Sequence, residues 1–92
     1  MEKQIEAYFV KKAKEHGAWA VKFVSPNNAG MPDRIIFKAN GETELAELKS
    51  PEECLTPLQE AVHRKLKSLG HRVAVIDNKE GVDEFWTSRH TS

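Results

Sequence analysis

The residues with the clearest chemical potential are Asp33 and the pair Glu47 and Lys49. In a β-strand, residues two apart project from the same side, so Glu47 and Lys49 are expected to face one way and Leu48 the other. Two carboxylates supply the oxygen ligands that Mg²⁺ and Mn²⁺ prefer. A cation held there activates a bound water and polarises a phosphoryl group, and the lysine orients that water or neutralises developing charge. The pattern therefore fits metal-dependent phosphodiester hydrolysis, whereas Glu47 and Lys49 taken alone also fit a solvated strand face with an exposed ion pair.

Asp33 joins this set only if the hairpin around Asn40 and Gly41 has the right register. An Asn-Gly dipeptide between two β-rich segments is a strong hairpin signal. A two-residue loop would place Asp33 opposite Leu48 and on the wrong face of the sheet. A three-residue loop with Gly41 in the left-handed conformation places Asp33 directly across from Glu47, with β-carbons about 5 Å apart. We therefore predict the three-residue loop, or a bulge with the same parity.

Hydrophobic periodicity and turn residues predict the elements that position this hairpin. We expect strands over residues 19–24, 33–38, 43–49 and 72–76, and helices over residues 2–16, 57–69 and a short segment after Asp77 or Asn78. The order is αβββαβα, an α/β fold with a mixed four-stranded sheet flanked by helices. A helical crossover precedes the last strand, so this strand is expected to run parallel to a strand of the hairpin. The predicted buried stripe of the second helix comprises Leu58, Val62, Leu66 and Leu69.

The composition is that of a small globular protein. A length of 92 residues suits a single domain over residues 1–92 with one modest core. The 14 basic and 14 acidic residues balance, which argues against a nonspecific DNA coat. Cys54 is the single cysteine, so no intrachain disulfide and no cysteine-based zinc site is expected. The charged N-terminus and the lack of a long apolar run predict no signal peptide and no membrane span.

Taken in order, several segments resemble the VRR-NUC family of virus-type replication-repair nucleases, within the PD-(D/E)xK superfamily. The segments are residues 2–6, Lys22-Phe23, residues 30–34, residues 47–49, and Gln59 after a Pro-containing loop. The resemblance covers nearly the whole chain, and the ordered set is far more specific than any single motif. It implies the restriction-endonuclease-like fold and a metal-dependent endonuclease acting on DNA.

The resemblance also implies a catalytic set, namely Asp33, Glu47, Lys49, Glu2 and Gln59. Asp33 and Glu47 would bind Mg²⁺ or Mn²⁺, with the backbone carbonyl of Leu48 as a third ligand. Lys49 would be the catalytic lysine. Glu2 would contact the metal through water or complete the site, and Gln59 would lie near the scissile phosphate.

Stand-alone members of this family, from phages and bacteria, resemble Holliday junction resolvases and act as homodimers. The resemblance therefore implies a homodimer that cuts four-way DNA junctions in DNA repair, in the cytosol of a bacterium or a phage-infected host. A two-fold dimer presents two equivalent sites, which suits paired nicks in a symmetric junction. The alternatives are a flap, nicking or restriction-like nuclease, and a catalytically silent DNA-binding module. The constellation of carboxylates and lysine argues against the silent module.

Two of the implied site residues have structural alternatives. Glu2 would also complement the positive end of the first helix, and Glu6, one turn further on, is the next acidic candidate. Thr56 and Gln59 have the spacing of a helix capping box, so Gln59 serves capping or catalysis equally well.

The remaining candidates concern DNA contacts and the histidines. Lys22 contacts a phosphate or is a solvated strand residue, and Arg34 positions a phosphate or is structural. The histidines show no paired ligand spacing, so none is predicted to bind metal; they are His16, His63, His71 and His90.

Overall fold

The computed structural model describes residues 3–88, and its order of elements is the predicted αβββαβα. The elements are α1 (Lys3–Glu15), β1 (Trp19–Lys22), β2 (Arg34–Phe37), β3 (Thr43–Leu48), α2 (Pro57–Ser68), β4 (Val73–Ile76) and α3 (Lys79–Ser88). The strands form one sheet in the order β1-β2-β3-β4. The first two pairings are antiparallel and β3 runs parallel to β4, which confirms the predicted mixed sheet.

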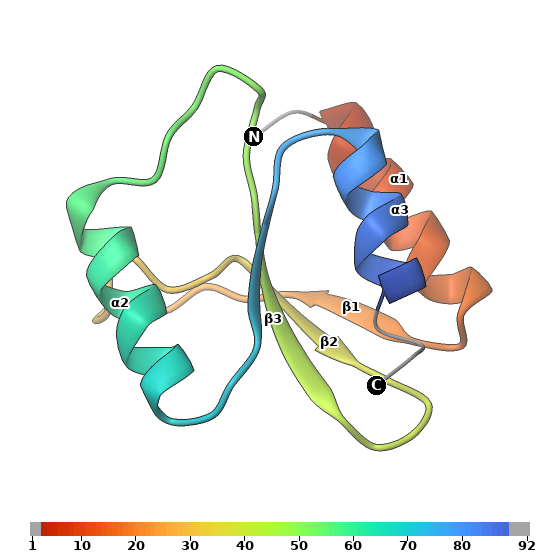
Figure 1. The fold of residues 1–92 in the computed structure, drawn as a ribbon, viewed down its shortest axis with the longest axis horizontal. Coiled ribbons are helices and arrows are strands. Elements are labelled where there is room, and N and C mark those ends of the chain that lie inside the picture. The colour runs from red at the N-terminus through yellow and green to blue at the C-terminus, as the bar shows by residue number, and fades with distance from the viewer. Residues whose placement is uncertain (1–2, 89–92) are drawn as a thin grey trace.

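Helices cover both faces of the sheet but unequally. Helices α1 and α3 lie side by side against one face, and α2 lies alone on the other (Figure 1). The core lies between the sheet and the α1–α3 pair, where Phe9 meets Phe85 with ring centroids 5.4 Å apart. Ile36, Ala46 and Leu48 point into this core from the sheet. Because strand side chains alternate, the odd-numbered residues of β2 and β3 face α2 instead.

The hairpin between β2 and β3 closes with the predicted three-residue loop. The Lys38 N–H donates to the Glu42 carbonyl at 2.9 Å, and the Gly41 N–H donates to the Lys38 carbonyl at 3.0 Å. The loop therefore comprises residues 39–41. Gly41 has a φ of 88°, a left-handed conformation that favours glycine.

The register that follows from this loop decides where the candidate site lies. Arg34 pairs with Ala46 across the antiparallel strands. One residue before β2, the same register places Asp33 opposite Glu47, and both then belong to the face that α2 covers. The predicted parity is therefore confirmed.

Helix α2 differs from its prediction in what it buries. Leu58 and Leu69 are 52% and 66% exposed, while Val62 and Leu66 are half-buried, so the predicted apolar stripe is buried only in part. The buried residue of the helix is His63. The physical reason is that, among residues 3–88, α2 has no neighbouring helix on its side of the sheet, so it buries only the side chains that point directly at the strands (Figure 1). The sheet face beside it is also uncovered, with Trp19 69% and Phe37 45% exposed.

Candidate active site

Asp33 is hydrogen-bonded on one side to Phe23, which follows β1, and on the other side to Leu48 in β3. Its backbone carbonyl accepts a hydrogen bond from the Phe23 N–H at 2.8 Å, and its side-chain Oδ1 accepts one from the Leu48 N–H at 3.1 Å. Burial raises the pKa of the Asp33 carboxyl, against the opposing effects of the Leu48 amide and the Arg34 charge. The carboxylate is therefore fixed in place by β3 in a partly desolvated position.

Glu47 is the more unusual of the two carboxylates. Its side chain is 6% exposed, and burial, followed by the negative charge of Asp33, raises its pKa to about 7. Within the described residues, its buried Oε1 has no hydrogen-bond partner. An ionised carboxylate in this position is poorly compensated, and a bound cation would supply the missing positive charge.

Lys49 follows β3 on the same face as Glu47. Its backbone N–H donates to the Ile76 carbonyl at 2.9 Å, so the strand geometry continues through this residue. The Lys49 charge lowers the pKa of Glu47, although burial and Asp33 outweigh it. The structure thus brings Asp33, Glu47 and Lys49 together at one end of the central hairpin.

The Leu48 carbonyl lies where the ladder between β2 and β3 stops. The register places Pro32 opposite Leu48, and proline has no N–H to donate. The Leu48 N–H is instead bonded to the Asp33 side chain. The Leu48 carbonyl therefore receives no backbone hydrogen bond from the opposite position, which leaves its lone pairs for another ligand.

These groups fit a hard divalent cation. Two carboxylates and one carbonyl form an all-oxygen set, the kind that Mg²⁺ and Mn²⁺ prefer, with water in the remaining positions. Among residues 3–88, no group of three His, Cys, Asp or Glu side chains is placed to hold a metal ion. Glu2, the predicted further acidic residue, lies outside the described residues.

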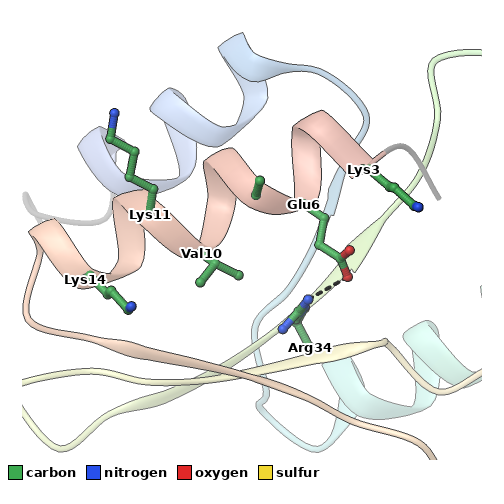
Figure 2. Close-up of a pocket in the computed structure, with 7 residues that line it drawn as sticks. Lys3, Glu6, Val10, Lys11, Lys14 and Arg34 are labelled. Carbon is green, nitrogen blue, oxygen red and sulfur yellow. Dashed lines mark hydrogen bonds and ion pairs between the residues drawn. The ribbon is translucent and has the colours of Figure 1, made fainter.

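Glu6, the other acidic candidate on the first helix, is engaged elsewhere. Its Oε2 lies 2.6 Å from Nη2 of Arg34, as Figure 2 shows. Arg34 is 8% exposed, and its Nη1 also donates to the Ala20 carbonyl at 3.3 Å. These contacts favour the structural alternative for Arg34. Lys22 pairs with Arg34 across β1 and β2 and therefore shares the face opposite to the two carboxylates. It is exposed, so it remains a candidate for DNA contact away from the carboxylates.

The Glu6–Arg34 pair lies in a groove under α1. The groove has a volume of about 600 Å³ and its basic lining residues are Lys3, Lys11, Lys14 and Arg34 (Figure 2). Because Arg34 and Asp33 are consecutive strand residues, this groove lies on the opposite face of the sheet from the two carboxylates.

Gln59 forms the capping box that the sequence allowed. The Thr56 N–H donates to Gln59 Oε1 at 3.0 Å, and the Gln59 N–H donates to Thr56 Oγ1 at 3.1 Å. The capping role is therefore confirmed, while a role near a phosphate stays a prediction. The two roles are compatible, because capping uses the oxygen of the side-chain amide and leaves its nitrogen available.

His63 lies beside Glu47, although it was not among the predicted site residues. Its Nε2 lies 3.5 Å from Glu47 Oε1, and its side chain is 5% exposed. Burial, followed by the charges of Lys67 and Lys49, lowers its pKa. One sequence signal was present: His63 is four residues after Gln59 and so projects from the same side of α2.

Comparisons with known proteins bear on the family and the fold of the chain. A family model described as "VRR-NUC domain" matches residues 1–80. The chain is 40% identical over 79 residues to "Putative nuclease p44" of Acyrthosiphon pisum secondary endosymbiont phage 1, covering 86% of this chain and 85% of the relative. A solved structure titled "VRR_NUC domain" superposes with a TM-score of 0.86 at 21% identity, covering 92% of each chain. At that identity the structural match bears on the fold alone.

Proposed function

The chain belongs to the VRR-NUC nuclease family, and from this premise we propose that it is a metal-dependent endonuclease that hydrolyses phosphodiester bonds in DNA. The observation that carries the proposal is the pair of carboxylates of Glu47 and Asp33, which the strand register places opposite each other and of which Glu47 is only 6% exposed. A single cation would compensate both carboxylates. Lys49 extends the same strand face and supplies the cationic side chain.

Each proposed residue has a distinct task. When bound, Mg²⁺ or Mn²⁺ supplies Lewis acidity and an activated water. Asp33 presents a carboxylate whose orientation the Leu48 N–H fixes. Glu47 supplies a desolvated carboxylate, and the Leu48 carbonyl supplies a third oxygen. Lys49 orients the attacking water or neutralises charge that develops on the phosphate. Glu2 is proposed to complete the site from the first helix, and Gln59 to reach the scissile phosphate.

We further propose that the substrate is a branched DNA, with the four-way junction as the main candidate, and that the protein acts as a homodimer. The exposed aromatic pair of Trp19 and Phe37, with ring centroids 6.0 Å apart, supports a contact with a second copy. Large exposed apolar residues that gather on one face are typical of protein interfaces. A two-fold dimer would carry two sites for the two strands of a symmetric junction.

Labelled four-way junctions, flaps, nicked duplexes and linear duplexes, incubated with Mg²⁺ or Mn²⁺, test the function. The expected result is paired nicks in the junction. Lys49→Ala should abolish cleavage without lowering the melting temperature. The control is Lys79→Ala, which should cleave normally, because the Lys79 ammonium lies 5.6 Å from the Tyr8 ring centroid and is not part of the proposed site. Preferred cleavage of flaps or linear duplex would favour the alternative nucleases. Tight binding to all substrates without cleavage would favour the silent DNA-binding module and contradict the proposal.

No helix within residues 3–88 is long and apolar enough to cross a membrane. We propose that residues 1–92 form a single nuclease domain that acts in DNA repair in the cytosol of a bacterium or a phage-infected cell.

A further inference from the structure

Two buried polar atoms face each other between α2 and β3. His63 Nε2 and Glu47 Oε1 are 3.5 Å apart, with side chains 5% and 6% exposed. Neither atom has a hydrogen-bond partner within the described part of the chain. Buried polar groups are rarely left in this state, and each such group calls for an explanation, such as strain, a catalytic role, an ion or a water molecule.

The distance is slightly longer than a hydrogen bond, which typically spans about 2.7–3.2 Å for N–H···O. A small rotation of either side chain would close the gap. Imidazole with a proton on Nε2 is a donor, and a carboxylate is an acceptor, so the two atoms are chemically complementary. The charged groups coupled to Glu47 are Asp33, Lys49 and Glu53, none of which is hydrogen-bonded to Oε1.

We propose that His63 is a positioning residue for Glu47: its Nε2–H holds one carboxylate oxygen and leaves the other for the divalent cation. This inference rests on the proposed nuclease function. Groups that hydrogen-bond a metal-binding carboxylate fix its orientation, and their loss typically weakens metal binding. His63 would therefore act through Glu47 without touching the cation.

The packing of α2 gives His63 a defined position for this role. Gly30, in the loop that leads to Asp33, has a φ of 93° and lies against the first turn of α2. A β-carbon at Gly30 would lie 3.1 Å from the Leu58 carbonyl oxygen. This close contact joins the start of α2 to the segment that carries Asp33. His63 lies five residues after Leu58 in the same helix, and its Nε2 is 3.5 Å from Glu47 Oε1.

A calorimetric titration of the metal-free full chain with Mn²⁺ tests the proposal, because it measures the affinity for the cation directly. His63→Leu removes the donor and is expected to weaken Mn²⁺ binding by about 10–100-fold. His63→Gln places an amide N–H in a similar position and should restore most of the affinity. The matched control is His71→Leu, at an exposed histidine after α2, which should bind like the wild type. Melting temperatures in EDTA establish that each variant is folded.

The outcomes separate this inference from the function on which it rests. Wild-type affinity in folded His63→Leu would overturn the positioning role, while junction cleavage by the wild type would leave the function standing. If the wild-type protein neither binds Mn²⁺ nor cuts DNA, the proposed function itself fails. If His63→Leu does not fold, the comparison of His63→Gln with the wild type decides, and a weakened His63→Gln overturns the proposal. Pulsed EPR that detects imidazole nitrogen bound directly to Mn²⁺ would also overturn it, because His63 would then be a ligand.

Discussion

The Arg34 guanidinium lies 2.6 Å from the Glu6 carboxylate, and this ion pair ties the first helix to the strand that begins beside Asp33. The two side chains are 9% and 26% exposed, so the pair is shielded from water without being fully buried. Arg34 also donates to the Ala20 carbonyl, so one side chain connects α1, β1 and β2. The pair therefore stabilises the start of β2 on the face of the sheet opposite to Glu47.

We expect Glu6→Gln to lower the free energy of unfolding by about 2 kcal/mol, because it leaves the buried Arg34 charge without its partner. Urea denaturation measures the change. Lys12→Met is the matched control, since it breaks the exposed pair between Lys12 and Glu15 and should change stability by less than about 0.5 kcal/mol. Equal losses in the two variants would contradict the structural role assigned to Arg34.

The metal-free protein should lose stability as the pH rises from about 4.5 to about 7. In this window folded Glu47, with a pKa of about 7, keeps a proton that the unfolded chain has released at its ordinary pKa of 4.5. The folded state binds more protons, so the free energy of unfolding falls, by at most about 3 kcal/mol. Asp33 contributes in the same direction, because burial raises its pKa too.

Urea denaturation in EDTA at about pH 5 and about pH 8, for the wild type and Glu47→Gln, measures this effect. His63 has a lowered pKa and so opposes the trend below its ordinary value of 6.5. The difference between the two proteins is therefore the quantity to compare. The free energy of unfolding of Glu47→Gln should increase relative to that of the wild type as the pH rises. Parallel pH profiles for the two proteins would show that Glu47 does not carry a raised pKa.

Two substitutions at Gln59 separate helix capping from catalysis. Gln59→Glu keeps an oxygen that can accept from the Thr56 N–H, as in the standard capping box, but loses the amide nitrogen. Gln59→Ala loses both and should lower stability by about 1 kcal/mol. If the amide reaches a phosphate, Gln59→Glu should retain the melting temperature and lose cleavage activity. A Gln59→Glu protein with full stability and full activity would leave Gln59 as a helix cap alone.

Substitution within the exposed aromatic pair tests the proposed dimer. Phe37→Lys should convert a dimer to a monomer in light scattering, because it places a charge in an apolar contact. Val24→Lys provides the control, at a residue that is 74% exposed in the loop after β1. A wild-type protein that is monomeric at all concentrations would contradict the dimer. A Phe37→Lys protein that stays dimeric would contradict the use of this face as the contact.

Local signals in the sequence were sufficient for the hairpin, but its register was predicted from the requirement of the site. Asn40-Gly41 marks the turn, and the requirement that Asp33 and Glu47 share a face selects the three-residue loop that the structure contains. The helix start at Pro57 was predictable for the same reason, because capping depends on residues within one turn. At α3 the sequence left Asp77 or Asn78 as the cap, and the 2.6 Å bond from the Gly81 N–H selects Asn78.

Features that depend on how elements pack could not be predicted in this way. Leu58 and Leu69 are exposed because the described part of the chain places no second helix beside α2 to cover them. The pairing of His63 with Glu47 depends on where α2 crosses β3, and residue spacing within α2 carries no information about that crossing. A periodic pattern identifies which side of a helix is apolar but not how much of that side finds a partner.

The hydrogen bond from the Leu48 amide uses only one of the two oxygens of the Asp33 side chain. One oxygen of the Asp33 carboxylate thus accepts the Leu48 N–H, in place of a backbone carbonyl, where Pro32 interrupts the strand pairing. The other oxygen can serve as a ligand at the same time. Asparagine at this position would keep the amide-accepting oxygen but turn an NH₂ group toward the cation. Asp33→Asn is therefore the replacement that divides the architectural contribution of the residue from its chemical one.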